Sequence, residues 1–382
     1  MDRSVAYLDN QATTPVDPRV REAMLPFLGQ VFGNPHSRDH AFGWDAANAV
    51  RRSRADVAAL VNADDDEVVF TSGATESCNL ALRGVAKAAP DRRRRIITIA
   101  TEHPAVIETV RDLGQTGFEV VILSVGSDGI VDLDHMDSML NDRTLVVSVM
   151  AGNNEIGVLQ PLAEIGAMCR HYGVIFHTDA TQAMGRIAVD VDDWQVDLLS
   201  LSGHKMYGPK GVGALFVREG TPIAPVFAGG GQEFGLRPGT VPVQLVVGLG
   251  EACALAVDSW RADAKRIAEL TNHLKAGLME SCPVIRFFGS MERRLPGSLS
   301  VGFGWPAHEV IAKVSDRIAV STGSACSSDS TEPSRVLRAL GLNDEAAASG
   351  VRISLGRFNI DKDVAAALNA FSRLPVAQEE YG

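Results

Sequence analysis

The sequence of 382 residues exceeds the ~250 to 300 residues at which one hydrophobic core usually stops growing, so we expect a large domain and a smaller one. Its net charge of −11, with 46% hydrophobic and 22% charged residues, is typical of a folded globular protein and disfavours direct binding of nucleic acid. The longest apolar runs are far shorter than the ~18 to 20 residues that span a bilayer, and the first residues lack the apolar core of a signal peptide. We therefore predict a cytoplasmic protein without a membrane partner.

Apolar segments rich in β-formers alternate with helical patterns through the first two thirds of the chain. The predicted strands are Val68 to Phe70, Ile96 to Ala100, Val120 to Leu123, Leu145 to Met150, Val174 to His177, Leu198 to Leu201 and Val212 to Val217. The predicted helices are about Glu76 to Ala89, Pro104 to Leu113 and Leu162 to His171. This alternation predicts an α/β fold whose mostly parallel central sheet is covered by helices on both faces. Ligands of such sheets bind beyond the carboxyl ends of the strands.

The last third of the chain has a different pattern. A Gly/Pro-rich stretch is followed by one long helical pattern, Gln244 to Met279, which predicts a connector into the smaller domain. Predicted strands Ser298 to Phe303, Ile318 to Ser321 and Val351 to Ser354 then alternate with helices His308 to Lys313, Ser334 to Leu340 and Asp361 to Leu374. We predict a large domain over residues 16–255 and a smaller α+β domain made of residues 1–15 and 256–382.

Small and hydroxyl-bearing residues follow the first strand of the predicted sheet, in the segment Thr71 to Ser77. They stand where a helix begins, and the free backbone N–H groups there favour an anion such as phosphate. An ordinary capping box, with Ser72 or Thr75 as the cap, explains the same residues equally well. The usual nucleotide-binding motifs, GxxxxGK[ST] and GxGxxG after a strand, are absent from the sequence.

Residues suited to a ring-shaped cofactor follow two further strands. Asp179 could pair with a cationic ring nitrogen, and Gln182 could donate to an oxygen on the same ring. His103 follows another strand and could stack on the ring and move protons. Alternatively, Asp179 is a helix N-cap and His103 is a polar loop residue.

Lysines are rare, with seven in the whole chain, and most of them lie in polar helical patterns. Lys205 instead follows an apolar strand directly, and Lys210 lies in the next turn. A lysine becomes nucleophilic when burial, nearby charge or a covalent cofactor tunes it, and a strand end in a cleft offers that setting. The alternative is a surface lysine in a turn. A phosphate cradle, a carboxylate and a lysine at successive strand ends together predict a pyridoxal phosphate site.

The five cysteines are odd in number, lie far apart and form no CxxC pair, which argues against a disulfide framework and a metal site. Cys78, Cys169, Cys253 and Cys282 have surroundings typical of buried structural thiols. Cys326 lies in the polar segment Ser321 to Ser330, which is unsuited to burying it. Because a thiolate is intrinsically very nucleophilic, we predict that Cys326 is catalytic.

Together these motifs resemble the NifS/IscS-type, group I cysteine desulfurases, which are pyridoxal phosphate enzymes of the class V aminotransferase group with fold type I. The resemblance covers Tyr7 to Phe371 and rests on the strings TSGATES, NNEIGV, DATQ, SGHKMYGPKGVGAL, GGGQE and STGSACSSDSTEPSRVLRALGL. Some positions depart from the family pattern, namely Ala151-Gly152, Phe234 and Pro238.

The resemblance implies a role for each matching residue. Lys205 would hold pyridoxal 5'-phosphate covalently, His103 would stack on its ring, and Asp179 and Gln182 would contact the ring nitrogen and the ring oxygen. The residues implied to hold the phosphate are Ala74, Thr75, Ser202 and His204, joined by Thr240 from the second subunit of a homodimer. Asn154, beside the cofactor, and Arg352 would bind the substrate carboxylate.

The resemblance further implies that L-cysteine is converted to L-alanine while its sulfur forms a persulfide on Cys326, which passes it to an acceptor protein. Iron–sulfur cluster assembly, thiolation of tRNA or a cofactor, and sulfur modification of DNA remain open as destinations, and the chain ends at Gly382 without the longer tail of housekeeping members. A class V aminotransferase, a selenocysteine or cysteine sulfinate lyase, and an inactive partner subunit of a sulfur-transfer complex are the alternatives.

Overall fold

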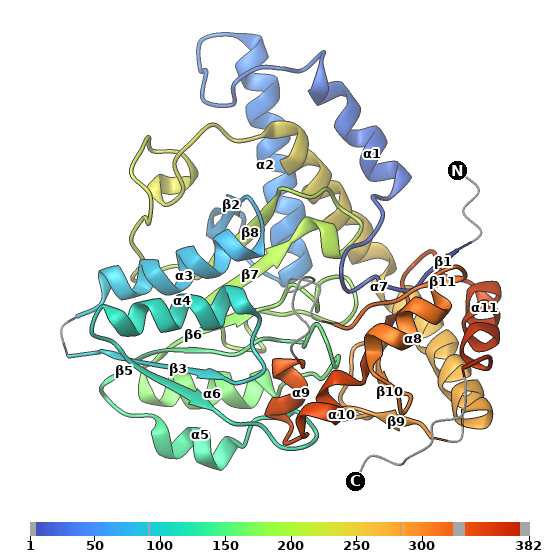
Figure 1. Ribbon diagram of the computed structural model, residues 1–382. Coiled ribbons are helices and arrows are strands. Elements are labelled where there is room, and N and C mark those ends of the chain that lie inside the picture. Colours follow the sequence, from blue (N-terminus) through green and yellow to red (C-terminus); the bar gives the residue numbers. More distant parts are fainter. Residues whose placement is uncertain (1–4, 91, 283, 324–332, 375–382) are drawn as a thin grey trace.

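The computed structural model describes residues 5–90, 92–282, 284–323 and 333–374 (Figure 1). Its centre is a seven-stranded sheet with the order β2-β8-β7-β6-β5-β3-β4. The strands are β2 (Val68–Thr71), β3 (Arg95–Ile99), β4 (Glu119–Leu123), β5 (Thr144–Ser148), β6 (Ile175–Asp179), β7 (Leu198–Ser202) and β8 (Gly213–Val217). All neighbouring pairs are parallel except those of β8, which runs antiparallel to β7 and β2. The predicted α/β fold with a mostly parallel sheet is confirmed.

Helices cover both faces of this sheet because successive strand residues point to opposite sides. Ile96 packs in the cluster with α3 (Ala74–Ala88) and α4 (Pro104–Gln115). Its neighbour Ile97 packs in the opposite cluster. The helices of that second face are α2 (Ala41–Val61), α5 (Leu133–Met139), α6 (Leu162–Tyr172) and the first half of α7 (Val243–Ser281).

A second core surrounds two smaller sheets in the C-terminal part of the chain. One sheet has the order β12-β10-β9, and the other pairs β1 with β11 in parallel. The elements of this region are β1 (Ala6–Tyr7), β9 (Arg286–Phe287), β10 (Ser298–Gly302), α8 (Ala307–Val314), β11 (Ile318–Ala319), α9 (Arg335–Ala339), α10 (Asp344–Ala348), β12 (Gly350–Ser354) and α11 (Asp361–Phe371). The domain boundaries predicted near residues 15 and 255 stay a prediction.

The long helix α7 connects the two cores. Its Val246 and Leu249 pack in the first core, and Leu270 and Leu274 pack in the second. Within the described part of the chain, α7 is long and apolar enough to cross a membrane by length and composition, but 44% of its apolar window is buried inside the protein. Contacts with α1, α2 and α11 instead indicate a core helix.

The sequence analysis did not predict several elements, chiefly α1 (Pro18–Met24), α2 and α5. Four short 3-10 helices, Leu25–Leu28, Asp65–Glu67, Gly203–Lys205 and Glu233–Gly235, were not expected either. In α2 the reason is visible in its buried face, where several positions are small or polar, including Gly43, Ala46 and Ser53. Such residues give a weak hydrophobic period, although they allow close helix packing.

Candidate active site

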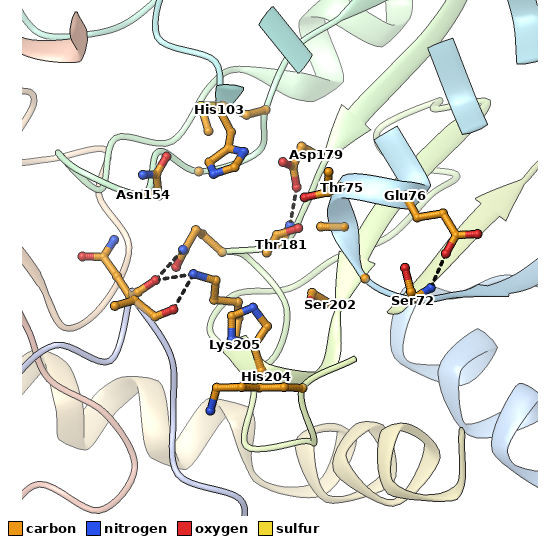
Figure 2. Close-up of a pocket in the computed structure, with 18 of the residues that line it drawn as sticks. Ser72, Thr75, Glu76, His103, Asn154, Asp179, Thr181, Ser202, His204 and Lys205 are labelled. Atoms are coloured by element: carbon orange, nitrogen blue, oxygen red, sulfur yellow. Dashed lines mark hydrogen bonds between the residues drawn. The ribbon is translucent and has the colours of Figure 1, made fainter. Parts of the chain in front are cut away.

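A cavity of about 400 Å³ opens at the carboxyl ends of the parallel strands. A volume in this range suits a small ligand or cofactor. Ten of the residues predicted from sequence line the cavity: Ala74, Thr75, His103, Asn154, Asp179, Gln182, Ser202, His204, Lys205 and Arg352. Figure 2 shows His103 and Asp179 across the space from Lys205 and His204.

The start of α3 lies at one end of the cavity. Gly73 is the N-cap, with φ of 147°, and no side chain caps the helix, so the proposed capping by Ser72 or Thr75 is wrong. The Gly73 conformation is essentially restricted to glycine. A Cβ on Gly213 of the neighbouring strand would come within 2.7 Å of the Gly73 Cα atom, so both glycines allow the close approach. The uncapped N–H groups at the start of this 15-residue helix suit a phosphate.

His204, in the 3-10 helix that follows β7, also lines the cavity. Its Nδ1 atom lies 3.0 Å from the Thr13 hydroxyl. Burial, with the nearby positive charges of Lys205 and Lys210, lowers the pKa of His204 to about 4, so the ring is neutral at pH 7. A neutral imidazole has one N–H donor and one acceptor nitrogen, so its two nitrogens together can contact the Thr13 hydroxyl and a ligand oxygen.

Lys205 lies on the floor of the cavity, and its amine is held by backbone carbonyls. Its Nζ atom donates to the carbonyl oxygens of Gln11 and Ala12, each at 2.7 Å (Figure 2). Both acceptors belong to the N-terminal segment, almost two hundred residues away in sequence. These two backbone carbonyls orient the amine.

Asp179 and His103 form the opposite side of the cavity. Asp179 ends β6, is 5% exposed, and accepts a hydrogen bond from the Thr181 backbone at 3.0 Å. His103 is the N-cap of α4, and its Nδ1 accepts the N–H of Ala105 at 3.1 Å. Burial lowers the pKa of His103, an effect that Asp179 opposes and Lys205 increases. The neutral ring therefore carries its proton on Nε2.

Gln182 supplies a direct sign that a ligand belongs in the cavity. Its Nε2 atom donates to the Gln11 carbonyl at 3.0 Å. Its Oε1 atom is buried and has no partner among the described residues, as is also true of the Thr181 hydroxyl. Buried polar atoms are normally paired, because an unpaired one costs about 1–3 kcal/mol. An anion site, a carboxylate, an amine and an unpaired amide oxygen in one cavity fit pyridoxal phosphate.

Arg352, on β12, brings the smaller sheet to the same cavity. The side chain is 2% exposed, and its guanidinium pairs with Asp9 at 2.7 Å. Its Nη1 atom donates to the Asn154 carbonyl at 2.8 Å. The predicted carboxylate-binding pair, Asn154 and Arg352, therefore lies together.

Two predicted residues are not placed in this cavity. Thr240 is exposed and lines a neighbouring groove, together with Thr75 and Glu76. Cys326 lies outside the described residues, although Gly323, three positions before it, lines the cavity. The other cysteines, Cys78, Cys169, Cys253 and Cys282, are free and buried as predicted, and burial raises the pKa of each thiol.

The sequence prediction missed the N-terminal segment of residues 9–14 as part of the site. Besides the contacts with Lys205 and Gln182, this segment supplies Asp9 to Arg352 and the Thr14 hydroxyl to the His204 carbonyl. These residues precede the first strand of the large sheet, so a search of strand ends could not find them. Their sequence signal is the run of polar residues after the buried Leu8.

Comparison with known proteins agrees with this arrangement. Residues 6–367 match the family described as aminotransferase class-V. The mitochondrial cysteine desulfurase of Arthroderma benhamiae is 49% identical over 362 residues, which cover 94% of this chain and 72% of that protein. The cysteine desulfurase IscS of Rickettsia bellii is 46% identical over 361 residues, covering 94% of this chain and 88% of that protein.

Among solved structures, one described as SspA in complex with cysteine matches with a TM-score of 0.82 and 36% sequence identity. The match covers 93% of this chain and all of that one (100%). Together with the uncapped α3 terminus and Lys205 in one cavity, these similarities identify the chain as a member of the class-V aminotransferase family, within its cysteine desulfurase branch.

Proposed function

We propose that this protein is a pyridoxal phosphate-dependent cysteine desulfurase, which converts L-cysteine to L-alanine and leaves the sulfur as a persulfide on Cys326. The observation that carries the proposal is the single cavity that holds Lys205, Asp179, the start of α3 and Arg352. The names of the two relatives and the cysteine in the SspA structure support L-cysteine as the substrate.

The cavity residues would hold the cofactor at its distinct groups. Lys205 would bind it covalently, Asp179 would pair with its ring nitrogen, and Gln182 would contact its ring oxygen. The phosphate would lie at the start of α3, with Ala74, Thr75, Ser202 and His204 around it. When bound, the cofactor supplies an electron sink that acidifies the Cα–H bond of an attached amino acid.

The chain's own groups would then bind the substrate and move its protons. Arg352 and Asn154 would bind the carboxylate of L-cysteine, since a guanidinium suits a carboxylate geometrically. The Lys205 amine lies on the cavity floor, where it can accept and return the Cα proton. The neutral His103 can accept a proton in the same space.

The sulfur transfer itself would be a thiolate displacement. The Cys326 thiolate attacks the sulfur of L-cysteine, so an S–S bond forms while the substrate C–S bond breaks, and its electron pair is protonated at Cβ. L-Cysteine and one enzyme thiol thus give L-alanine and one enzyme persulfide, without an external oxidant. The persulfide sulfur would then pass to the thiol of an acceptor protein.

We further propose a cytoplasmic homodimer in which Thr240 of each subunit completes the phosphate site of the other. The exposed Thr240, in the groove beside Thr75, supports this arrangement. The relatives occur in different places: the Arthroderma protein is named mitochondrial, whereas IscS is bacterial.

The test is spectroscopic and chemical. Purified protein should be yellow and should form alanine and sulfide from L-cysteine in the presence of dithiothreitol. Cys326→Ala should keep the colour and lose sulfide release, whereas Lys205→Ala should lose the covalent cofactor. Alanine formed without a keto acid would exclude transamination. Full sulfide release by Cys326→Ala would contradict the persulfide step.

A further inference from the structure

Arg352 uses most of its hydrogen-bond donors within the protein. A guanidinium has five N–H groups. One Nη1 hydrogen goes to the Asn154 carbonyl at 2.8 Å and the other to the Gly323 carbonyl at 3.0 Å. The Nε and Nη2 atoms donate to one oxygen of Asp9, at 3.2 and 2.7 Å. Among the described residues, one Nη2 hydrogen is left for a ligand in the cavity.

Asp9 is held where it can act on Arg352. Its main chain forms a parallel bridge with Ser354, two residues along β12 from Arg352. The same carboxylate oxygen that binds the guanidinium also accepts the Ser321 hydroxyl at 3.0 Å. The Tyr7 hydroxyl donates to the Asp9 carbonyl at 2.9 Å. The Asp9 main chain is thus held by Ser354 and Tyr7, and its carboxylate is held by Ser321.

We propose that Asp9 is a positioning residue for substrate recognition: it holds one edge of the Arg352 guanidinium, so that the remaining Nη2 hydrogen is presented to the carboxylate of the amino acid substrate. The inference rests on the proposed function. It assigns Asp9 no contact with the reacting atoms.

The physical reason is the burial of Arg352. A guanidinium that is 2% exposed needs a negative partner, because a buried charge without one is strongly destabilising. The two carbonyls on Nη1 are neutral and bind a single nitrogen, which leaves rotation of the planar group about the Cδ–Nε bond less restrained. The two hydrogen bonds to Asp9 fix the plane of the guanidinium, and the direction of the remaining Nη2–H depends on that plane.

The experiment compares Asp9→Ala and Asp9→Asn with the wild-type holoenzyme. We expect Asp9→Ala to raise the KM for L-cysteine about ten- to a hundredfold, the range of a charge-assisted hydrogen bond, while kcat changes less than about threefold. Asp9→Asn keeps a hydrogen-bond acceptor in the same place, so its KM should lie between those of the wild type and Asp9→Ala. The dissociation constant for L-alanine, measured by calorimetry without turnover, should rise with the KM.

The matched control is Asp192→Ala. Asp192 pairs with Arg218 at 2.8 Å but is 67% exposed and does not line the cavity. This variant should leave KM and the L-alanine dissociation constant unchanged. Bound cofactor per chain and the thermal midpoint should stay near wild type in Asp9→Asn, even if Asp9→Ala folds poorly.

The outcomes separate the inference from the proposed function. If the wild type turns over L-cysteine while both Asp9 variants keep KM and L-alanine affinity within about twofold, the positioning role is wrong and the function stands. Equal losses of kcat and cofactor content in Asp9→Asn would show a structural role and also overturn the inference. A wild type that neither binds L-alanine nor releases sulfide would overturn the proposed function and, with it, this inference.

Discussion

At the scale of single residues, the environment of His103 decides its chemical state. The ring lies at the start of α4, with Nδ1 occupied by the Ala105 N–H at 3.1 Å. A protonated ring would have to donate from Nδ1 and break this bond. Burial also lowers its pKa. Both effects favour a neutral imidazole, which is the form that can accept a proton.

This state predicts the pH dependence of catalysis. If His103 accepts a proton during turnover, kcat/KM for L-cysteine should fall as the pH decreases through a pKa below 6.5, the ordinary value for histidine. His103→Gln should have a lower kcat/KM, and the decrease of kcat/KM at low pH (the acid limb) should be absent from its pH profile. His135→Gln, at an exposed site on α5, should keep both the activity and the acid limb. An unchanged acid limb in His103→Gln would exclude His103 as its source.

At the scale of elements, His177 joins three strands of the large sheet. It lies on β6, two residues before Asp179, and its ring contacts Ser148 on β5 at 2.8 Å and Ser200 on β7 at 3.0 Å. The side chain is fully buried. Burial lowers the pKa of His177 to about 4, so the folded protein keeps the ring neutral where the unfolded chain would protonate it.

The stability of the sheet should therefore depend on pH through His177. Its contribution is complete above pH 6.5 and is lost as the pH falls towards 4, because in that range only the unfolded chain binds the proton. At 1.36 kcal/mol per pH unit the loss amounts to about 3 kcal/mol. Urea denaturation of the wild type and His177→Gln between pH 4.5 and 7 measures it. If the free energy of unfolding changes with pH equally in the wild type and His177→Gln, His177 is not the source of the pH dependence.

At the scale of the whole molecule, one region exposes aromatic side chains that a single chain leaves in water. Phe32 is 71% exposed and lies against Phe42, with ring centroids 5.3 Å apart. A groove lined by Pro35 and His36 also contains Phe234, which is 58% exposed and lies under the Arg54 guanidinium. Apolar patches of this kind mark interaction sites. Phe234 also lies six residues before Thr240.

The proposed homodimer therefore predicts a shared effect of substitutions in this region. Phe32→Asp and Phe234→Asp should shift the protein to a monomer at micromolar concentration, because a charge would be buried at the interface. If Thr240 acts across the interface, the variants that lose the dimer should also retain less cofactor. Ile360→Asp, at an exposed apolar position in the smaller sheet region, is the control. Sedimentation velocity measures the outcome, and dimers formed by both Phe variants would contradict the interface.

The sequence alone determined the fold class and most of the cavity residues. Periodic apolar segments predicted the strands, and parallel strands place their carboxyl ends at one edge of the sheet. His103, Asp179 and Lys205 follow three such strands, so their meeting in one cavity was predictable without coordinates. Cys326 stays a prediction from sequence, since the structure does not describe it.

The tertiary structure decided what lies far apart along the chain. Asp9 and Arg352 are 343 residues apart, and no local pattern records their contact. The uncapped start of α3 was equally undecidable, since the sequence allowed a capping box there and the conformation of Gly73 excluded it. The propensity of a segment for helix or strand depends on residues close in sequence. Contacts such as Asp9–Arg352 instead form because the packing of distant segments buries a charge, which then needs a partner of opposite charge.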